Sequence, residues 1–202
     1  SPTKHLDSLP THLSEDFVAR LAVYEALTFS DLAAVVIVPA DEGLLFDNMA
    51  AALATRYRVI VLDIPASRGT YQDLTEKLVR ELAQIGVESF SIIGVSHGAM
   101  VALAQAVYVP EKVQRLVLVS PSQVLAQNPE LGARLSDVQA PTLVLVGTSD
   151  RSGSREAGRM FREKIPTCYL LLVYEAGHAI VADRHEACLS SISEFLEQGE
   201  GF

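Results

Sequence analysis

The sequence predicts an α/β protein with a mostly parallel central sheet and helices on both faces. Short apolar runs such as "AAVVIVPA" (33–40) alternate with helix-like segments from about residue 33 onward. Such runs are typical of strands that are covered on both faces. Repeated strand–helix units favour parallel strands joined by right-handed crossovers. No linker, repeat or low-complexity tract divides the sequence, so residues 1–202 are expected to form a single domain.

The spacing of apolar residues predicts the elements in the first half of the chain. After the strand at 33–40, a second strand is expected at "RVIVLDIP" (58–65), with a helix over residues 46–57 between them. Another helix is expected over residues 71–85, and Gly86 is well placed to end it. Five apolar residues share one face of that helix: Tyr71, Leu74, Leu78, Leu82 and Ile85.

The second half continues the alternation. Buried strands are expected at 89–95, 113–120, 141–147 and 168–176, and helices at 97–108, 154–164 and 184–198. The start of the chain follows a different pattern. Residues 1–12 are polar and punctuated by proline, which predicts a loose N-terminal arm, and residues 17–27 fit either an opening antiparallel strand or a short helix, of which the strand is favoured.

Composition excludes several classes of function. The formal net charge is −9, and no cluster of Lys and Arg offsets it, so nucleic-acid binding is not expected. The apolar runs are too short to span a bilayer, and no basic and apolar leader opens the sequence, so a cytoplasmic protein without a membrane span is expected. The two cysteines, Cys168 and Cys188, lack metal-ligand spacing and are expected to be reduced and mostly buried.

The motif "GVSHG" (94–98) stands between an expected strand and an expected helix. This is the context in which G-x-S-x-G forms a nucleophile elbow, a sharp turn that exposes the serine hydroxyl. The backbone comes so close at this turn that the residues two before and two after the serine must be tiny, and Gly94 and Gly98 meet that need. The motif alone fits an ordinary tight loop equally well. It lacks the Gly-Lys-Ser/Thr ending of a phosphate-binding loop.

An acid and a base follow Ser96 in the order that this fold requires. Asp150 comes three residues after the strand at 141–147, and His178 follows the strand at 168–176. Because the carboxyl ends of parallel strands meet at one edge, both side chains are expected beside Ser96. His185 is the competing base, but it lies among charges at the start of the last helix, where a solvated position is favoured.

These segments together resemble the α/β-hydrolase superfamily over residues 17–198. "IGVSHGAMVALAQAVYVPEKVQRLVLVSP" is similar to its nucleophile elbow with the following helix and strand, "PTLVLVGTSD" to its acid loop, and "EAGHAIVADRHEACLSSISEFL" to its histidine loop and last helix. The resemblance implies that Ser96 is the nucleophile, His178 the general base and Asp150 the acid that orients it. It implies no cofactor, and Asp183, His185 and Glu186 lack the spacing of metal ligands.

The chain departs from the superfamily pattern in two places. Where relatives often carry His-Gly after the third strand, this chain has "PADEG", so Asp41 falls at the position of one oxyanion-hole N–H donor and His97 at the other. The acidic side chains there favour a cationic or neutral substrate. The connection at 121–140 is short, which implies a minimal lid over a shallow, open pocket, bordered by Val124, Leu125 and Leu131 unless these residues pack onto the sheet.

The sequence therefore predicts a serine hydrolase that cleaves a carboxylic ester or thioester of a small molecule through an acyl-enzyme. Lactone opening, cofactor-free perhydrolysis and C–C bond hydrolysis use the same three residues and stay open. The alternative is a non-catalytic ligand-binding or scaffold protein on the same fold, since a fold does not fix a function. The oligomeric state does not follow from the sequence.

Overall fold

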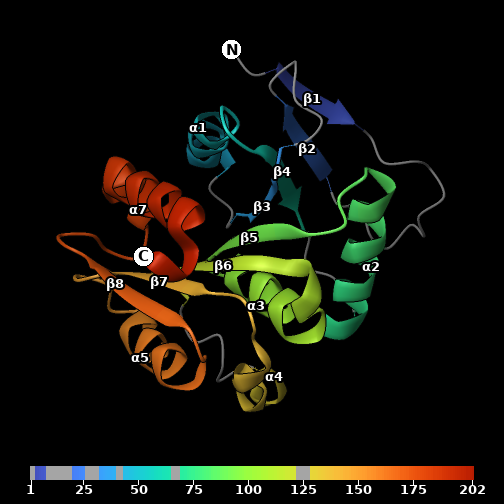
Figure 1. Cartoon of the computed structure of the whole chain (residues 1–202). Helices are drawn as coiled ribbons and strands as arrows, with labels where there is room; N and C mark the ends of the chain where they lie inside the picture. The colour runs from blue at the N-terminus through green and yellow to red at the C-terminus, as the bar shows by residue number, and fades with distance from the viewer. Residues whose placement is uncertain (1–2, 8–19, 26–31, 40–42, 65–68, 122–127) are drawn as a thin grey trace.

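A single sheet runs through the middle of the molecule (Figure 1). The structure is a computed structural model that describes residues 3–7, 20–25, 32–39, 43–64, 69–121 and 128–202. Within these ranges the sheet has eight strands in the order β1-β2-β4-β3-β5-β6-β7-β8. The strands are β1 (Thr3–Asp7), β2 (Arg20–Glu25), β3 (Ala34–Val38), β4 (Arg58–Asp63), β5 (Phe90–Val95), β6 (Val113–Val119), β7 (Thr142–Gly147) and β8 (Cys168–Val173).

Strands β4, β3, β5, β6, β7 and β8 are parallel to one another. Strand β2 runs antiparallel to both of its neighbours, β1 and β4. The described helices are α1 (Gly43–Leu53), α2 (Tyr71–Gln84), α3 (Gly98–Tyr108), α4 (Pro129–Ala133), α5 (Ser154–Lys164), α6 (Ile180–Asp183) and α7 (His185–Gln198), with single 3-10 turns η1 (Pro110–Lys112), η2 (Leu135–Asp137) and η3 (Gly199–Gly201).

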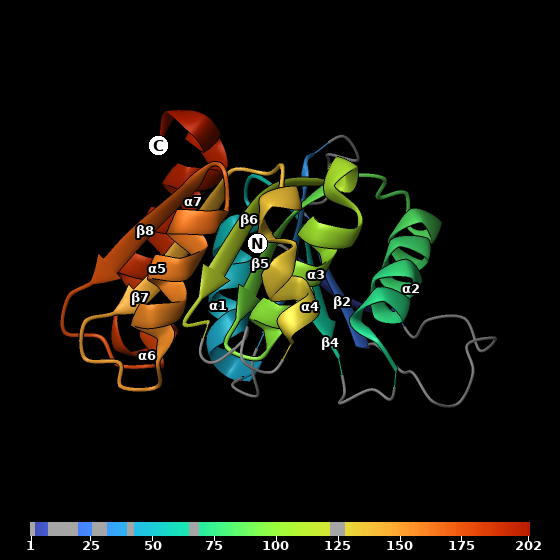
Figure 2. The ribbon, with the colours of Figure 1, turned by 90° about the horizontal axis from the view of Figure 1, so that it is seen from below.

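The helices form a layer on each face of the sheet (Figures 1 and 2). Helices α2, α3, α4 and α5 cover one face, and α1, α6 and α7 cover the other. Successive residues of a strand point to opposite faces, so Ile92 of β5 joins the first core and Ile93 joins the second. Both side chains are almost completely buried. This explains why the central strands are continuous apolar runs rather than alternating ones.

The parallel sheet with helices on both faces confirms the predicted fold class. Every strand and helix expected from residue 33 onward is present, with ends that differ by at most a few residues from the expected ones. Residues 20–25 form β2, paired antiparallel with β4, as favoured for the ambiguous segment 17–27. The short helices α4 and α6 were not predicted, because five and four residues are too few to show a helical period.

The expected loose arm over residues 1–12 contains a strand. Residues Thr3–Asp7 form β1, which pairs antiparallel with β2 at the edge of the sheet. An edge strand is held by main-chain hydrogen bonds and does not need an apolar run, so the pattern of these residues does not indicate it. The other residues of the predicted arm lie outside the described ranges.

The described part of the connection between β6 and β7 packs into the core. Leu131 of α4, Leu135 of η2 and Val138 are buried against the face that α3 and α5 cover. Leu131 therefore takes the packing role rather than bordering a pocket. Val124 and Leu125, the other two residues considered for the pocket, lie outside the described residues. In its described part, this short connection has no helical domain of its own, in agreement with a minimal lid.

Candidate active site

Ser96 occupies a strained turn between β5 and α3. Its φ angle is 51°, in the left-handed region that non-glycine residues rarely adopt. A Cβ atom on Gly94 would lie 2.4 Å from the carbonyl oxygen of Gly98, and one on Gly98 would lie 2.2 Å from the carbonyl oxygen of Val38. Both contacts involve backbone that cannot move aside. The turn therefore requires glycine two residues before and two residues after Ser96, as the motif predicts.

The turn directs the Ser96 hydroxyl toward a histidine. Ser96 is mostly buried, and its backbone N–H donates a hydrogen bond to the carbonyl of Val119, at the end of β6, over 2.8 Å. The Ser96 Oγ lies 3.0 Å from Nε2 of His178. These two residues are far apart in sequence and meet because β5 and β8 end at the same edge of the sheet.

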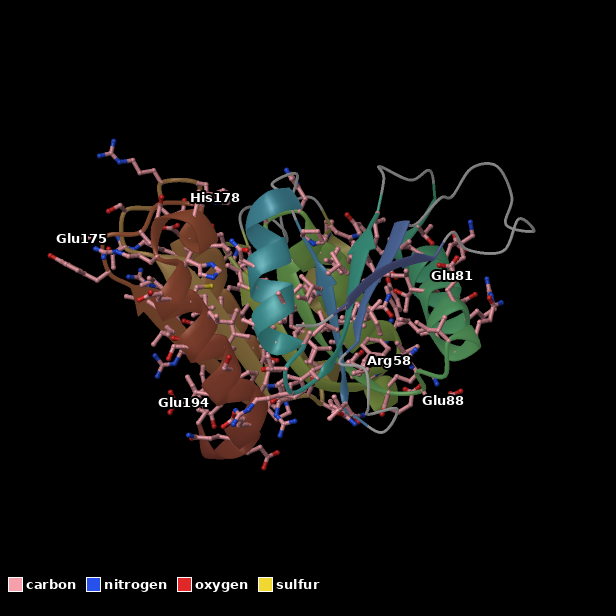
Figure 3. The ribbon with its side chains drawn as sticks, turned by 90° about the horizontal axis from the view of Figure 1, so that it is seen from above. Arg58, Glu81, Glu88, Glu175, His178 and Glu194 are labelled. Carbon is pink, nitrogen blue, oxygen red and sulfur yellow. The ribbon has the colours of Figure 1, made fainter. Side chains whose placement is uncertain are left out.

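His178 in turn contacts Asp150. The Nδ1 atom of His178 lies 3.1 Å from Oδ2 of Asp150, whose side chain is completely buried, while the His178 side chain is 40% exposed. Asp150 follows β7 and His178 follows β8, and Figure 3 shows His178 on the segment after β8, at the same end of the molecule as Glu175. The structure thus brings together the serine, histidine and aspartate that the sequence singled out.

The environment of Asp150 keeps its carboxylate ionised. Burial favours the neutral acid and raises the pKa, but hydrogen bonds to the carboxylate from Ser152, Ser154 and His178 outweigh burial, so the pKa lies below that of an ordinary aspartate. One of these is the backbone N–H of Ser152, which donates to Oδ1 over 2.8 Å. A buried negative charge beside Nδ1 favours the tautomer that leaves Nε2 free to accept a proton from Ser96.

Three polar residues that the sequence did not assign to the site support this arrangement. Ser120 is fully buried, and its hydroxyl donates to the backbone carbonyl of His178 over 2.6 Å. The hydroxyl of Ser152 lies 3.1 Å from Nδ1 of His178, and the carboxylate of Asp183 accepts the backbone N–H of Gly177 over 2.7 Å. Serines and aspartates are common in loops, so nothing in the sequence distinguishes these three residues from others of their kind.

The other candidate groups do not join the site. His185, the competing base, is the first residue of α7 and is half-buried, and the hydrogen bonds of Ser96 Oγ and Asp150 Oδ2 go to His178 instead. Burial raises the pKa of both Cys168 and Cys188 to about 12, so neither thiol is ionised at neutral pH. Among the residues with described positions, no group of three or more His, Cys, Asp or Glu is placed to hold a metal ion.

Of the two expected oxyanion donors, one can be located. His97 lies between Ser96 and the first residue of α3, and its backbone N–H makes no hydrogen bond to the backbone of another described residue. The N-terminus of a helix presents free N–H groups and a partial positive charge. Asp41, the other expected donor, lies outside the described residues. The end of β3 nevertheless lies directly against Gly98, through the close approach of the Val38 carbonyl.

Comparisons with known proteins agree with this architecture. A family model described as "alpha/beta hydrolase fold" matches residues 34–135, which is 102 of the 202 residues. A rice protein (Oryza sativa subsp. japonica) named "Probable 1-acylglycerol-3-phosphate O-acyltransferase" is 27% identical over 198 residues, covering 77% of this chain and 47% of that protein. The chain therefore spans about half the length of this curated relative.

Solved structures share the fold at low sequence identity. A "predicted CIB-like hydrolase" from Thermoplasma acidophilum superposes with a TM-score of 0.78 at 17% identity, covering 97% of this chain and 98% of that one. The carboxylesterase CesB from Bacillus subtilis superposes with a TM-score of 0.77 at 15% identity, covering 97% and 92% of the two chains. Likeness at this level of identity concerns the fold, and with the family match it leads to one conclusion: the chain belongs to the α/β-hydrolase fold family.

Proposed function

We propose that the protein is a serine hydrolase that cleaves a carboxylic ester or thioester of a small molecule. The observation that carries the proposal is the chain of contacts from Ser96 Oγ to His178 Nε2 (3.0 Å) and from His178 Nδ1 to Asp150 Oδ2 (3.1 Å). A hydroxyl becomes a nucleophile when a base accepts its proton and a third group holds that base in place. Ser96, His178 and Asp150 fit these three roles.

The reaction follows from the positions of these groups. Nε2 of His178 takes the proton of the Ser96 hydroxyl while Oγ attacks the substrate carbonyl, and Asp150 stabilises the imidazolium that forms. His178 then gives that proton to the departing alcohol or thiol, which leaves an acyl group on Ser96. A water molecule next loses a proton to His178 and attacks the acyl carbonyl. His178 passes this proton to Oγ of Ser96 as the acid departs, which restores both residues.

The negative charge that develops on the substrate oxygen needs hydrogen-bond donors. The N–H of His97 is suited to this role because it adjoins the nucleophile at the start of a helix. Asp41 is the second donor in this proposal, and the contact between Val38 and Gly98 supports it, because this contact holds the end of β3 against the start of α3. Asp41 and Glu42 are acidic, and negative charge beside the second donor would favour neutral or cationic substrates.

Labelling with a fluorophosphonate probe tests the proposal. The wild-type protein is expected to be labelled on Ser96, and Ser96→Ala is expected to lose both the label and the turnover of short acyl esters. His178→Ala should lose turnover as well, whereas His185→Ala, the matched histidine outside the site, should keep it. A folded wild-type protein that carries no label on Ser96 would contradict the proposal.

A non-catalytic ligand-binding protein is the alternative, and the acidic "PADEG" segment favours it because it departs from the superfamily pattern at the oxyanion position. On this alternative, ligands bind equally well to the wild type and to Ser96→Ala, and no ester is turned over. Turnover that disappears in Ser96→Ala would exclude the alternative.

The name of the rice relative raises the question of which molecule accepts the acyl group. An acyl-serine can be attacked by an alcohol as well as by water, so the same residues would support acyl transfer. A panel of short and medium acyl esters and thioesters, assayed with and without an added alcohol, separates the two outcomes. The minimal lid favours short acyl groups and water as the acceptor.

A further inference from the structure

Helix α5 carries a row of arginines on one side. Arg155, Arg159 and Arg162 follow one another in α5 at intervals of four and three residues, which places them along one flank of the helix, and Arg151 comes three residues before its first residue. All four are exposed. The buried residues of α5, which include Ala157, Gly158 and Phe161, occupy the neighbouring side and pack onto the sheet. We call these four residues the arginine row.

The row is a local excess of positive charge on an acidic protein. Residues 151–164 contain five basic residues, the row and Lys164, and two acidic ones, Glu156 and Glu163, so this segment has a net charge of +3 (5 − 2). The whole chain carries −9. The two glutamates are seven residues apart and share a flank beyond the row. No ion pair found within the described ranges involves an arginine of the row.

One arginine of the row, Arg162, lies near the edge strand β8. Burial raises the pKa of the Cys168 thiol, and the charge of Arg162 acts against that effect, so Arg162 lies near the first residue of β8. β8 is the last strand at this edge, and α5 lies beside it (Figure 2). The side chain of Leu170 contacts α5 at Gly158, so Leu172, two residues further along β8, points to the same face.

Two large apolar side chains are exposed in and directly after β8. Leu172 is 50% exposed and Tyr174 is 74% exposed, and they are the two exposed large hydrophobic residues within the described part of the chain. Both also lie at the rim of a shallow pocket of about 320 Å³ between β8 and α7, on the face of the sheet opposite to α5, together with Leu171 and Val173. Glu175 follows directly, but Arg184 forms an ion pair with it. The edge of the molecule at β8 thus combines unpaired arginines with an exposed leucine and tyrosine.

From this combination we infer that the α5–β8 edge is a docking surface for an anionic lipid bilayer. The arginines of the row would contact lipid phosphate groups, while Leu172 and Tyr174 would enter the boundary between headgroups and acyl chains. Arg151 directly follows Asp150, so docking would hold the edge that carries Ser96 and His178 close to the membrane surface. The described residues contain no helix with the length and apolarity to cross a bilayer, so the contact is peripheral.

The same charges argue against a second copy of this chain as the occupant. An exposed edge strand can pair with itself across a two-fold axis. That arrangement would place the two α5 helices side by side on one face of the joined sheet, with their arginine rows toward each other. The repulsion between the rows opposes such a dimer, whereas an anionic surface is attracted by the same groups.

Vesicle sedimentation tests the inference. The protein is expected to bind vesicles of phosphatidylcholine mixed with phosphatidylglycerol, to bind phosphatidylcholine alone much more weakly, and to be released by high salt. Each arginine near an anionic bilayer is expected to change binding about fivefold. Arg159→Gln should therefore weaken binding about fivefold, and the triple change R155Q/R159Q/R162Q about 100-fold. Arg80→Gln, an exposed arginine on α2, is the matched control and should bind like the wild type.

Further variants separate this inference from the proposed hydrolase activity. Leu172→Ser with Tyr174→Ser should weaken vesicle binding while leaving its dependence on salt, and Ser96→Ala should bind vesicles like the wild type. Circular dichroism checks that each variant is folded. Equal binding of the wild type and the triple variant, or no binding to anionic vesicles, would overturn the inference. So would dimerisation through this edge in light scattering, or retention on duplex DNA without binding to vesicles.

Discussion

Ser120 shows how much of the site depends on residues that do not react. Its hydroxyl holds the backbone carbonyl of His178, while the residue before it, Val119, accepts the N–H of Ser96 through its own carbonyl. Ser120 also has a φ of 47°, and its N–H donates to Leu145 on β7. One dipeptide at the end of β6 therefore fixes the backbone of the proposed nucleophile and of its proposed base.

Removing the Ser120 hydroxyl should slow the reaction without weakening substrate binding. Ser120→Ala leaves a partly buried carbonyl without its partner, which costs about 1 kcal/mol, and loosens the position of His178. We expect kcat to fall about tenfold or more while KM changes little. Steady-state kinetics measure the two constants. Ser191→Ala is the matched control, because this half-buried serine also donates to a backbone carbonyl, that of Ala187, but on α7 rather than in the site. A fall in kcat of equal size in both variants would contradict the role of Ser120.

Asp150 should influence both rate and stability through its charge. Asp150→Asn keeps the shape of the side chain but removes the charge and favours the wrong histidine tautomer, so we expect kcat/KM to fall about 10³-fold to 10⁴-fold. Hydrolysis of a short acyl ester measures this change. A fall of less than tenfold would count against Asp150 as the orienting acid.

The sign of the effect of pH on stability follows from the lowered pKa of Asp150. A carboxyl group whose pKa is lower in the folded state adds stability that is fully present above the pKa of the unfolded chain, about 3.9, and is lost as the pH falls through the folded-state pKa. The difference in the free energy of unfolding between the wild type and Asp150→Asn should therefore shrink below about pH 4. Urea unfolding at several pH values measures it. A difference that grows on acidification would contradict the assignment.

At the scale of elements, the nucleophile elbow depends on close packing between α3 and the ends of β3 and β5. A methyl group on Gly98 would meet backbone atoms of Val38. Gly98→Ala should therefore separate α3 from β3, lower stability by about 2 kcal/mol, and reduce activity strongly. Gly201→Ala is the matched control, since a Cβ there would have no heavy atom within 4 Å. Thermal unfolding and ester hydrolysis measure the two effects, and equal stability of the two variants would contradict this account.

The elements themselves were largely predictable, and the reason is physical. A strand such as β7 is buried on both faces, so its residues are apolar throughout and its limits are visible in the sequence. The glycines around Ser96 are equally visible because no other residue fits there. The positions of Ser96, Asp150 and His178 near one another also followed, since the ends of parallel strands share one edge.

What could not be predicted are the features that depend on backbone contacts or on single polar side chains. β1 is held by main-chain pairing with β2, and any polar sequence can make such bonds. Ser120 is important because of one hydrogen bond to a residue 58 positions away, and nothing in its own neighbourhood marks that partner. The four arginines of the row are spread over residues 151–162 and did not stand out as a cluster in the sequence, and their place beside the edge strand became visible only when α5 and β8 were placed together.

At the scale of the whole molecule, we propose that residues 1–202 form one domain. Both helical layers pack on the same sheet, so neither core can open without exposing strands that the other core covers. Unfolding in urea should therefore show one transition, with far-ultraviolet circular dichroism and ester hydrolysis lost at the same midpoint. Two separate transitions would contradict a single cooperative domain.

The place of β8 in the chain has a consequence for how the protein is made. β8 is at once the edge of the sheet and its last strand in sequence. During synthesis on the ribosome, the segment with Ser96 emerges well before the segment with His178, and domains generally form from the N-terminal side. Ser96 is then without its proposed base while the earlier strands assemble. A nascent chain that ends before β8 should therefore be inert toward a fluorophosphonate, so the reactive hydroxyl is withheld until the last strand has docked.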